Sequence, residues 1–387
     1  MLKAIEMKKG IYWVGAVDWS MRSFHGYSTR RGSSYNAYLI LDEKITLIDT
    51  VKAPFAAELL ERVSSVVDPA SIDYIISNHV EPDHSGSLPT MAKHCPKAEI
   101  ITSAPNGLKG LSARYGKLPY RAVKTGETLS LGKRTLSFVA TPMLHWPDSM
   151  VTYCPEEKTL FSNDAFGQHL ASNLRFDDEN SLAVIMEEAK KYYANILMLY
   201  GKQAETALKA LGGLPIETIL TGHGVSWRAH IPEILAAYTK WSVGTLEEKA
   251  VVVFDTMWGS TERLARTIAD AFTEKGMPVS LFDLRVDHIS DVITEVLDSK
   301  YLAVGSPTIN NQMMPPVASF LCYLKGFVPK GRRAFAFGSF GWGGQSVGLV
   351  EDELKTMNLD ICLEKIRVKD VPADADLTSI REKIAAL

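Results

Sequence analysis

The chain has 387 residues, of which 46% are hydrophobic, and its formal net charge is −3 at pH 7. This length predicts two or three domains that each bury a core, and the balanced charge excludes a strongly basic nucleic-acid-binding surface. No apolar run approaches the length of a membrane span, and the first residues lack the profile of a signal peptide. We therefore expect a soluble, cytoplasmic protein with no membrane contact.

Four scattered cysteines limit the metal chemistry of the chain. Cys95, Cys154, Cys322 and Cys362 form no Cys-x-x-Cys pair. A thiolate iron centre or a zinc ribbon is therefore not expected within this chain. An electron donor built on such a centre would have to be a separate protein.

Residues 1 to about 60 predict an antiparallel sheet. Short alternating segments at 10–15, 35–40 and 45–49 are typical of strands, and a helix is predicted at about 54–66. His25 falls in a loop of this region. It is either an ordinary surface or core histidine or a candidate catalytic residue that contacts the ligands of a metal site.

A dense group of candidate metal ligands follows a buried strand predicted at 73–76. His79, Glu81 and Asp83 are spaced two residues apart, so on an extended backbone their side chains point to the same side. His84 follows directly. Four ligand-type side chains this close rarely arise for helix capping alone, because their charges would repel one another without a cation. The spacing therefore predicts the beginning of a two-metal site.

The backbone around these ligands is also predicted. Pro82 biases Glu81 away from the helical region and favours an extended segment. A helix is expected to begin within 85–87.

An apolar strand that ends at a His or Asp recurs further along the chain. Three predicted strands end in this way: 136–141 before His145, 159–162 before Asp164, and 218–221 before His223. Each residue alone would more often be a satisfied loop residue, but the recurrence favours one shared metal site. Mixed carboxylate and imidazole ligands favour iron or manganese, and zinc is also compatible.

The seven candidates divide between two ions. A carboxylate has one oxygen for each of two metals, so Asp164 is a candidate bridge. The remaining ligands then fall into two sets: His79, Glu81 and His145 for one ion, and Asp83, His84 and His223 for the other.

A second domain begins near residue 247. The continuous β-branched run at 250–254 is typical of a central parallel strand. Strands and helices then alternate to the end, with strands near 278–283, 300–305, 333–338 and 362–369, and helices near 260–275, 288–298, 314–326, 346–357 and 376–386. This alternation predicts a doubly wound parallel α/β sheet.

Three loops at strand ends of this domain suit a phosphate and a flat heterocycle. They contain Thr256, Met257, Trp258, Gly259, Ser260 and Thr261; Ser306, Pro307, Thr308, Ile309, Asn310 and Asn311; and Ser339, Phe340, Gly341, Trp342, Gly343 and Gly344. The first loop alone is equally well explained by helix capping. All three loops meet at the topological switch point of the sheet, and this favours a binding site.

These residues resemble the flavodiiron proteins. The N-terminal part is similar to the metallo-β-lactamase fold, an αββα sandwich whose hydrolases carry a His-x-His-x-Asp-His motif. Here Glu81 replaces the second histidine. That replacement, with His145, Asp164 and His223 in order, is similar to the flavodiiron family, whose site is a non-haem diiron centre. An anionic ligand stabilises ferric iron better than a neutral imidazole does.

The C-terminal loops resemble those of flavodoxin and imply bound FMN. By this resemblance, 256–261 hold the phosphate, while 306–311 and 339–344 surround the isoalloxazine ring and Trp342 packs on it. The resemblance covers both domains, which we place at 1–247 and 248–387.

The resemblance also implies an activity and partners. FMN would receive electrons from an external donor such as rubredoxin, and the diiron site would reduce O2 to water, NO to N2O, or both. A head-to-tail homodimer, or a dimer of dimers, would bring the flavin of one subunit to the metal centre of its partner.

Two other functions are compatible with parts of the sequence. One is a metallo-hydrolase with an appended flavodoxin-like module, against which Glu81 argues. The other is an electron-transfer flavoprotein with a vestigial metal site, against which the seven intact ligand positions argue.

Overall fold

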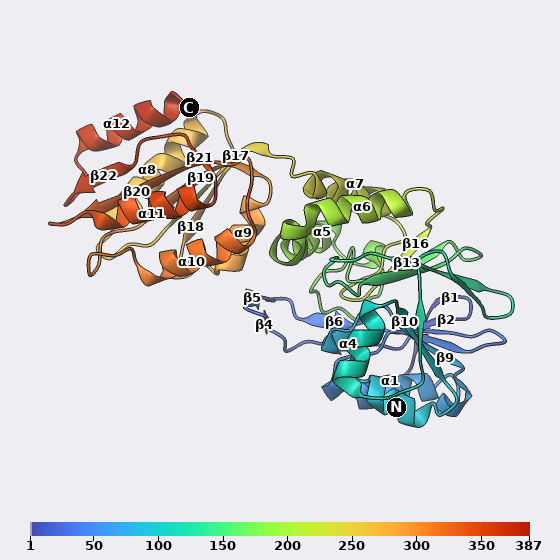
Figure 1. Cartoon of the computed structure of the whole chain (residues 1–387). Helices are drawn as coiled ribbons and strands as arrows, with labels where there is room; N and C mark the ends of the chain where they lie inside the picture. The colour runs from blue at the N-terminus through green and yellow to red at the C-terminus, as the bar shows by residue number, and fades with distance from the viewer. Residues whose placement is uncertain (1) are drawn as a thin grey trace. The chain divides into compact units, whose positions relative to one another are not determined.

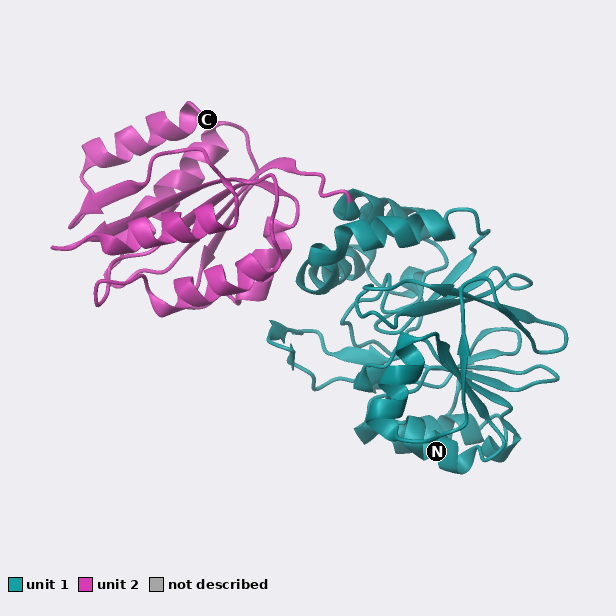
Figure 2. Cartoon of the chain, in the orientation of Figure 1, with its two compact units in different colours: residues 1–242 teal, residues 243–387 magenta. Residues whose placement is uncertain are grey.

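The computed structural model describes residues 2–387. The chain divides into two compact units, residues 1–242 and 243–387 (Figure 2). Among the residues described, no helix combines the length and hydropathy needed to cross a membrane.

The first unit contains a mixed seven-stranded sheet. In spatial order its strands are β1 (Ile5–Lys8), β2 (Ile11–Trp13), β7 (Tyr38–Ile40), β8 (Thr46–Ile48), β9 (Tyr74–Ser77), β10 (Glu99–Ser103) and β11 (Tyr120–Val123). Pairing is antiparallel from β1 to β8 and parallel from β8 to β11. The parallel half carries the first candidate ligands, directly after β9.

A five-stranded sheet packs against the first. Its strands are β12 (Thr128–Ser130), β13 (Thr135–Ala140), β14 (Met150–Cys154), β15 (Thr159–Asn163) and β16 (Thr218–Thr221), antiparallel except between β15 and β16. Buried apolar side chains from both sheets, such as Ile76 and Phe161, form the core between them.

Helices complete the sandwich. On the outer face of the seven-stranded sheet lie α1 (Ala56–Ser64), α3 (Leu88–His94) and α4 (Asn106–Tyr115), which contribute Leu59, Met91 and Leu111 to a second core. On the side of the five-stranded sheet lie α5 (Leu182–Tyr192), α6 (Gly201–Leu211) and α7 (Ile231–Ser242) (Figure 1). The predicted metallo-β-lactamase-like αββα sandwich is confirmed.

Two predicted segments of this unit are wrong in detail. The strand predicted at 35–40 is two strands, β6 (Ser33–Tyr35), which pairs with β3 (Ala16–Asp18), and β7. Between these two strands, the backbone N–H of Asn36 donates to the carbonyl oxygen of Gly222, in the loop after β16 (2.8 Å). A small hairpin, β4 (Ser23–Phe24) and β5 (Tyr27–Ser28), lies between β3 and β6.

The ligand segment after β9 does not stay extended through Asp83 as predicted. A short helix, α2 (Pro82–Ser85), already begins at Pro82, which suits the first turn of a helix. Glu81 before it is extended (φ −57°, ψ 139°), as predicted from Pro82. Asp83 and His84 therefore project from a helical turn.

The second unit is a parallel doubly wound sheet, as predicted. Its strands are β17 (Glu247–Phe254), β18 (Val279–Asp283), β19 (Ser299–Gly305), β20 (Arg333–Phe340), β21 (Asp360–Ile361) and β22 (Ile366–Lys369). The order is β18-β17-β19-β20, and both β21 and β22 pair with β20. The strand predicted at 362–369 is thus two short strands. The two compact units divide between residues 242 and 243, and the boundary expected near 247 stays a prediction.

Helices cover both faces of this sheet. On one face, α8 (Ser260–Glu274) and α12 (Asp374–Ala385) bury Leu264 and Ile380 in a core with β17 and β20. The other helices are α9 (Ile289–Val296), α10 (Pro315–Gly326) and α11 (Gln345–Thr356) (Figure 1).

Candidate metal centre and flavin pocket

The structure brings the seven candidate ligands together at strand ends. They form two groups, His79, Glu81, His145 and Asp164, and Asp83, His84 and His223, and within each group one ligand atom per residue lies within 4.8 Å of the others. Loops after β9, β13, β15 and β16 supply them, together with the first turn of α2. Residues far apart in the sequence therefore converge on one place.

Asp164 lies between the two groups. Its Oδ2 is 3.3 Å from His145 Nε2 and 3.6 Å from His79 Nε2. Its Oδ1 is 2.9 Å from His84 Nε2 and 3.4 Å from His223 Nε2. Each carboxylate oxygen thus faces a different group, which is the geometry that a bridge between two cations requires.

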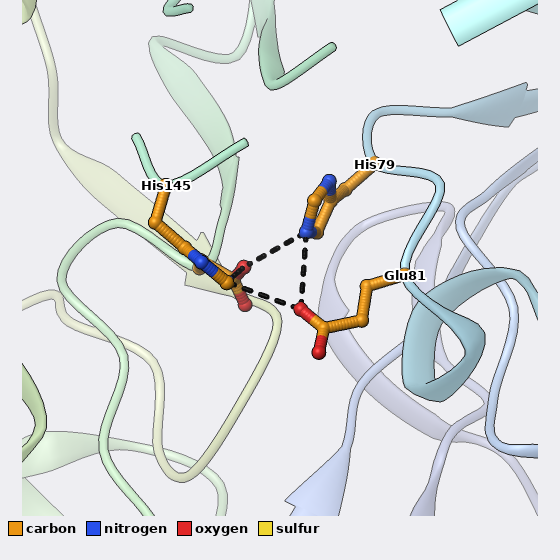
Figure 3. Close-up of side chains that lie close together, drawn as sticks. His79, Glu81 and His145 are labelled. Carbon is orange, nitrogen blue, oxygen red and sulfur yellow. Dashed lines mark hydrogen bonds and ion pairs between the residues drawn. The ribbon is translucent and has the colours of Figure 1, made fainter. Parts of the chain in front are cut away.

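Glu81 completes the first group. Its Oε2 lies 3.3 Å from His79 Nε2 and 3.1 Å from His145 Nε2 (Figure 3). Its Oε1 lies 3.0 Å from Nε2 of His25, a residue at the turn of the β4–β5 hairpin. The His25 side chain is 72% exposed, whereas that of Glu81 is 6% exposed. The structure thus places His25 at the solvent edge of the group.

The charges in the cluster stabilise one another. Burial would raise the pKa of Asp164, but the surrounding imidazoles lower it well below its usual range. Burial would lower the pKa of His145 and His223, but their carboxylate partners raise these values to about 9 and about 10. Without a metal, His145 and His223 therefore pair with carboxylates as imidazolium ions, and a cation would displace their protons.

Several atoms of the cluster fit a metal better than any protein partner. The carboxylate oxygens of Asp83 and Asp164 and both ring nitrogens of His84 are buried without a hydrogen bond. Buried charged groups without such partners are costly. Oxygen and imidazole donors in this number suit two iron ions. The donor set therefore fits the diiron centre that the resemblance implies.

A carboxylate and a backbone carbonyl group orient two of the histidine ligands. His79 Nδ1 lies 2.9 Å from Asp148 Oδ2, which also accepts from Val80 N (2.7 Å). His223 Nδ1 donates to Ser34 O (2.7 Å), which leaves Nε2 directed at the cluster. Such partners fix the tautomer and orientation of a metal-binding imidazole. Asp148 was missed from sequence, although it follows His145 by only three residues.

Asp49 ties two ligand segments together. Its carboxylate accepts from Asn78 N (2.7 Å), Asn78 Nδ2 (3.0 Å) and Asn163 Nδ2 (3.1 Å). These asparagines immediately precede His79 and Asp164. Its neighbour Thr50 donates to the carbonyl of His84 from both its backbone N–H and its hydroxyl. An aspartate at the end of the strand predicted at 45–49 was the only sequence signal for this role.

His169 was also missed from sequence. It is buried beside His223, with ring centroids 4.9 Å apart, and its Nδ1 lies 2.7 Å from Ser33 Oγ. Its Nε2 is buried without a hydrogen bond. Burial, with a contribution from His223, lowers the pKa of His169 well below its usual value, so the ring is neutral. No strand end precedes it at close range, so the pattern that identified the other histidines did not apply.

The loops predicted to bind a flavin form a pocket of about 650 Å³ in the second unit. Thirteen of its lining residues come from the sequence prediction: Thr256, Met257, Trp258, Ser260, Pro307, Thr308, Asn310, Asn311, Ser339, Phe340, Gly341, Trp342 and Gly343. The carboxyl ends of β17, β19 and β20 thus meet at one site, as the topology predicts.

Five predicted residues do not line this pocket: Gly259, Thr261, Ser306, Ile309 and Gly344. Two of them, Thr261 and Ser306, are buried and contact other residues of the fold. Thr261 Oγ1 lies 2.8 Å from Ser339 Oγ, and Ser306 Oγ accepts from Met314 N (2.9 Å). Asp370 and Val371, which follow β22, line the pocket and were missed because only three strand ends were considered.

Gly259 shapes the start of α8. It has φ +86°, a left-handed conformation that residues with a side chain rarely adopt, and no side chain caps the helix. The first turn of α8, which contains the pocket-lining residue Ser260, therefore has N–H groups without a side-chain cap, an arrangement that suits a phosphate. The residues present fit an FMN phosphate.

Comparison with protein families gives two matches. Residues 34–224 match the ODP family beta lactamase model, and residues 252–384 match the flavodoxin model. One match lies within each compact unit.

The chain is similar to characterised proteins over its whole length. It is 45% identical to a nitric oxide reductase from Moorella thermoacetica, with 100% of this chain and 99% of the relative covered. It is 41% identical to a rubredoxin-oxygen oxidoreductase from Megalodesulfovibrio gigas, with 98% and 96% covered. A crystal structure of the flavodiiron protein from Giardia intestinalis superposes with a TM-score of 0.97 at 40% identity, covering 100% of this chain and 96% of that one.

Proposed function

Because this chain belongs to the flavodiiron protein family and is a diiron, FMN-dependent oxidoreductase, we propose that it reduces dioxygen to water, nitric oxide to nitrous oxide, or both. The substrates are taken from the names of its relatives. The observation that carries the proposal is the position of Asp164, which offers one oxygen to each of the two ligand groups. In the first group, Glu81 stands where the related hydrolases have a histidine.

We assign the seven residues of the cluster as iron ligands. His79, Glu81 and His145 would hold one ion, Asp83, His84 and His223 would hold the other, and Asp164 would offer one oxygen to each. When bound, the two irons and the FMN supply the redox chemistry by which electrons reach the substrate. His25, whose imidazole lies 3.0 Å from Glu81, positions this carboxylate at the solvent edge.

The rest of the chain orients these groups and keeps water away. Asp148 and Ser34 fix the imidazoles of His79 and His223 through hydrogen bonds to Nδ1. Six of the seven ligands are buried, and only His145 is partly accessible. Charged ligands in so dry an environment bind a cation strongly, since little water competes for them.

We place the N-terminal diiron domain at 1–247 and the C-terminal domain at 248–387. The three loops of the C-terminal domain bind FMN. The first turn of α8, with Thr256 and Ser260, holds the phosphate. Trp342, which is 98% exposed at the pocket, covers the isoalloxazine ring. Phe340 and the loop after β19 complete the contacts.

We propose an external rubredoxin-type donor, because the chain has no Cys-x-x-Cys pair and one relative is named for rubredoxin. We also propose a cytoplasmic location and a head-to-tail homodimer, or a dimer of dimers. In this assembly the flavin of one subunit serves the metal centre of its partner. A self-complementary interface supplies two such junctions at once.

Mixing two inactive subunits tests the dimer. A His79→Ala subunit lacks the metal centre and a Gly259→Val subunit lacks the flavin. Heterodimers should recover turnover, because one junction then contains both working sites. A fully active monomer, or mixed dimers without turnover, would contradict the assembly.

Parallel reactions with the two gases test the activity itself. The iron- and FMN-loaded protein is reduced under anaerobic conditions and mixed with O2 or with NO, and flavin reoxidation is followed by stopped-flow absorbance. Fast reoxidation with at least one gas, with water or N2O as the product, is expected. An iron-free zinc form with equal activity would overturn the proposal.

A further inference from the structure

A groove of about 620 Å³ lies beside the metal cluster in the first unit. One wall is the face of α4 that carries Asn106, Gly110 and Ala113, which recur every three or four residues and so share one side of the helix. The opposite wall is formed by Trp146 and Pro147. The groove therefore lies between a surface helix and the loop that carries a proposed iron ligand.

The groove ends close to that first ligand group. The ring centroid of Trp146 is 5.1 Å from that of His79 and 6.1 Å from that of His145. Asp148, which orients the imidazole of His79, also lines the groove. A molecule in the groove would thus be one aromatic side chain away from two proposed iron ligands.

The segment of chain around the groove is strongly basic. Residues 100–126 contain five lysines or arginines and no Asp or Glu, although acidic residues outnumber basic ones in the whole chain, 45 to 42. At 3.6 residues per turn, Lys109 and Arg114 lie on either side of the face of α4 that lines the groove. The groove is therefore flanked by two cations.

Four of these five cations have no counterion within the chain. The side chains of Lys109, Arg114, Lys117 and Lys124 are exposed, and none of them forms an ion pair with another residue of 2–387. One exposed lysine alone is ordinary. Several unpaired cations in one segment, however, create a positive potential that attracts an acidic surface and speeds its association.

We propose that the groove and these four cations dock an acidic surface of the external electron donor. This inference rests on the proposed function, which requires a donor outside the chain. The charge extends from α4 to the residue after β11, which favours a protein over a small anion. Trp146 and Arg114 supply the aromatic and guanidinium groups that are enriched at protein interfaces. In the proposed head-to-tail dimer the partner's flavin serves this metal centre, so a donor docked here stands beside that flavin.

Carbodiimide cross-linking locates the docking surface. Oxidised rubredoxin with a net negative charge is mixed with the iron- and FMN-loaded protein, and the reagent joins lysine amines to carboxylates that contact them. We expect peptide mass spectrometry to find links at Lys109, Lys117 or Lys124. Links confined to lysines of the second unit, such as Lys369 beside the flavin pocket, would contradict the proposal.

Calorimetric titration with the same rubredoxin measures the contribution of the charges. The double variant Lys109→Glu/Arg114→Glu should weaken binding by about tenfold or more at 0.1 M NaCl. The control Lys133→Glu/Lys202→Glu reverses two exposed cations of the same unit and should change affinity by less than about twofold. Binding to the parent should weaken at 1 M NaCl, where the Debye length falls from about 10 Å to about 3 Å. Equal losses in both double variants would contradict a local docking site.

A third pair of variants tests the groove without changing its charge. Ala113→Phe places a ring on the exposed Ala113 that lines the groove, and it should also weaken binding by about tenfold. Ala210→Phe, at an exposed position of α6, should not. Dissociation of the homodimer by Lys109→Glu/Arg114→Glu, measured by light scattering, would assign the groove to the subunit contact and contradict donor docking.

The readouts separate the two proposals, because binding is measured with oxidised proteins and without turnover. Reduction of O2 or NO with a chemical reductant, but no rubredoxin binding at the groove, contradicts the docking surface and leaves the proposed function standing. Binding at the groove in a protein that reduces neither gas contradicts the proposed function alone.

Discussion

The metal cluster and the flavin pocket are built in opposite ways. The cluster consists of charged side chains that are almost all buried and held by hydrogen bonds from surrounding segments. The pocket is formed by loops whose largest side chains, Trp258 and Trp342, are 94% and 98% exposed. Its shape comes from backbone conformations, such as the positive φ of Gly259, Asn310 and Asn311.

This contrast teaches where each site is vulnerable. A change of one charged side chain in the cluster removes a ligand or leaves a buried partner without its counterion. In the pocket, loss of one side chain removes a single contact, while a change in backbone conformation displaces several N–H groups together. The predictions that follow test this difference.

The largest effect is expected at Asp164. In Asp164→Ala both oxygens between the two ligand groups are lost, and four imidazoles lose a carboxylate oxygen within 3.6 Å. We expect the variant to lose nearly all iron and reductase activity but to retain FMN, because the flavin loops belong to the other unit. Iron is measured by mass spectrometry and FMN by absorbance. Asp178→Ala, an exposed carboxylate of the same unit, should keep both.

The next largest effect is expected at Gly259. Valine there would have to adopt φ +86°, which costs about 1–2 kcal/mol for an L-residue, so the loop should change conformation instead. We expect Gly259→Val to release FMN and to leave the iron content unchanged. Gly276→Val is the matched control, since Gly276 has φ +78° at the other end of α8 and equally open surroundings. It should lose stability but keep FMN. Full flavin occupancy in Gly259→Val would contradict the phosphate placement.

The sequence predicted the ligands of the cluster well because the signal is local. Each lies within a few residues of a strand end, and the spacing of His79, Glu81 and Asp83 is dense enough to suggest a metal. The resemblance to flavodiiron proteins then identified the chemistry. The helical turn at Asp83 was missed because Pro82 serves equally well in an extended segment and at the start of a helix.

Supporting residues were not predictable in the same way. Asp49 and Asn163 are 114 positions apart, and Ser33 and His169 are 136 apart. No local pattern encodes these pairs, since tertiary packing brings them together. In the second unit, the fifth strand was predicted, but the loop after it, with Asp370 and Val371, was not predicted to be part of the pocket.

A smaller effect is expected at Asp49, which supports the cluster without being a ligand. Asn in its place keeps the volume but presents an NH2 group to the donors of Asn78 and Asn163. We expect Asp49→Asn to weaken iron binding by about 10- to 100-fold, the usual range for such partners, and to alter the spectroscopic signature of the diiron centre.

Asp42→Asn is the control for Asp49. Asp42 also accepts backbone N–H groups, from Lys133 and Arg134, but far from the cluster. It should leave iron affinity and the spectrum unchanged. Equal losses in both variants would mean that Asp49 acts only through general stability.

The smallest effect concerns how the two units respond to pH. Burial raises the pKa of Asp255, beside the flavin loop, so its charged form destabilises the folded state as pH rises through and above about 4. Burial would also raise the pKa of Asp177 in the first unit, but backbone N–H groups of 228–230 lower it. The charge of Asp177 therefore stabilises the fold above about 4, and this contribution is lost as pH falls through its lowered pKa.

Asparagine at either position removes a titrating carboxyl group. At neutral pH the two substitutions should change the local stability in opposite directions. Asp255→Asn keeps an oxygen that accepts from Thr256 N, so at pH 7 it should slow hydrogen exchange of α8 amides, by up to about 1 kcal/mol in opening free energy. Asp177→Asn should speed exchange at 228–230 under the same conditions. Both differences from the parent should shrink below pH 4, because the parent carboxyl groups are then increasingly protonated. Faster exchange in Asp255→Asn at pH 7 would mean that the buried charge is compensated by Arg285, whose attraction opposes the shift.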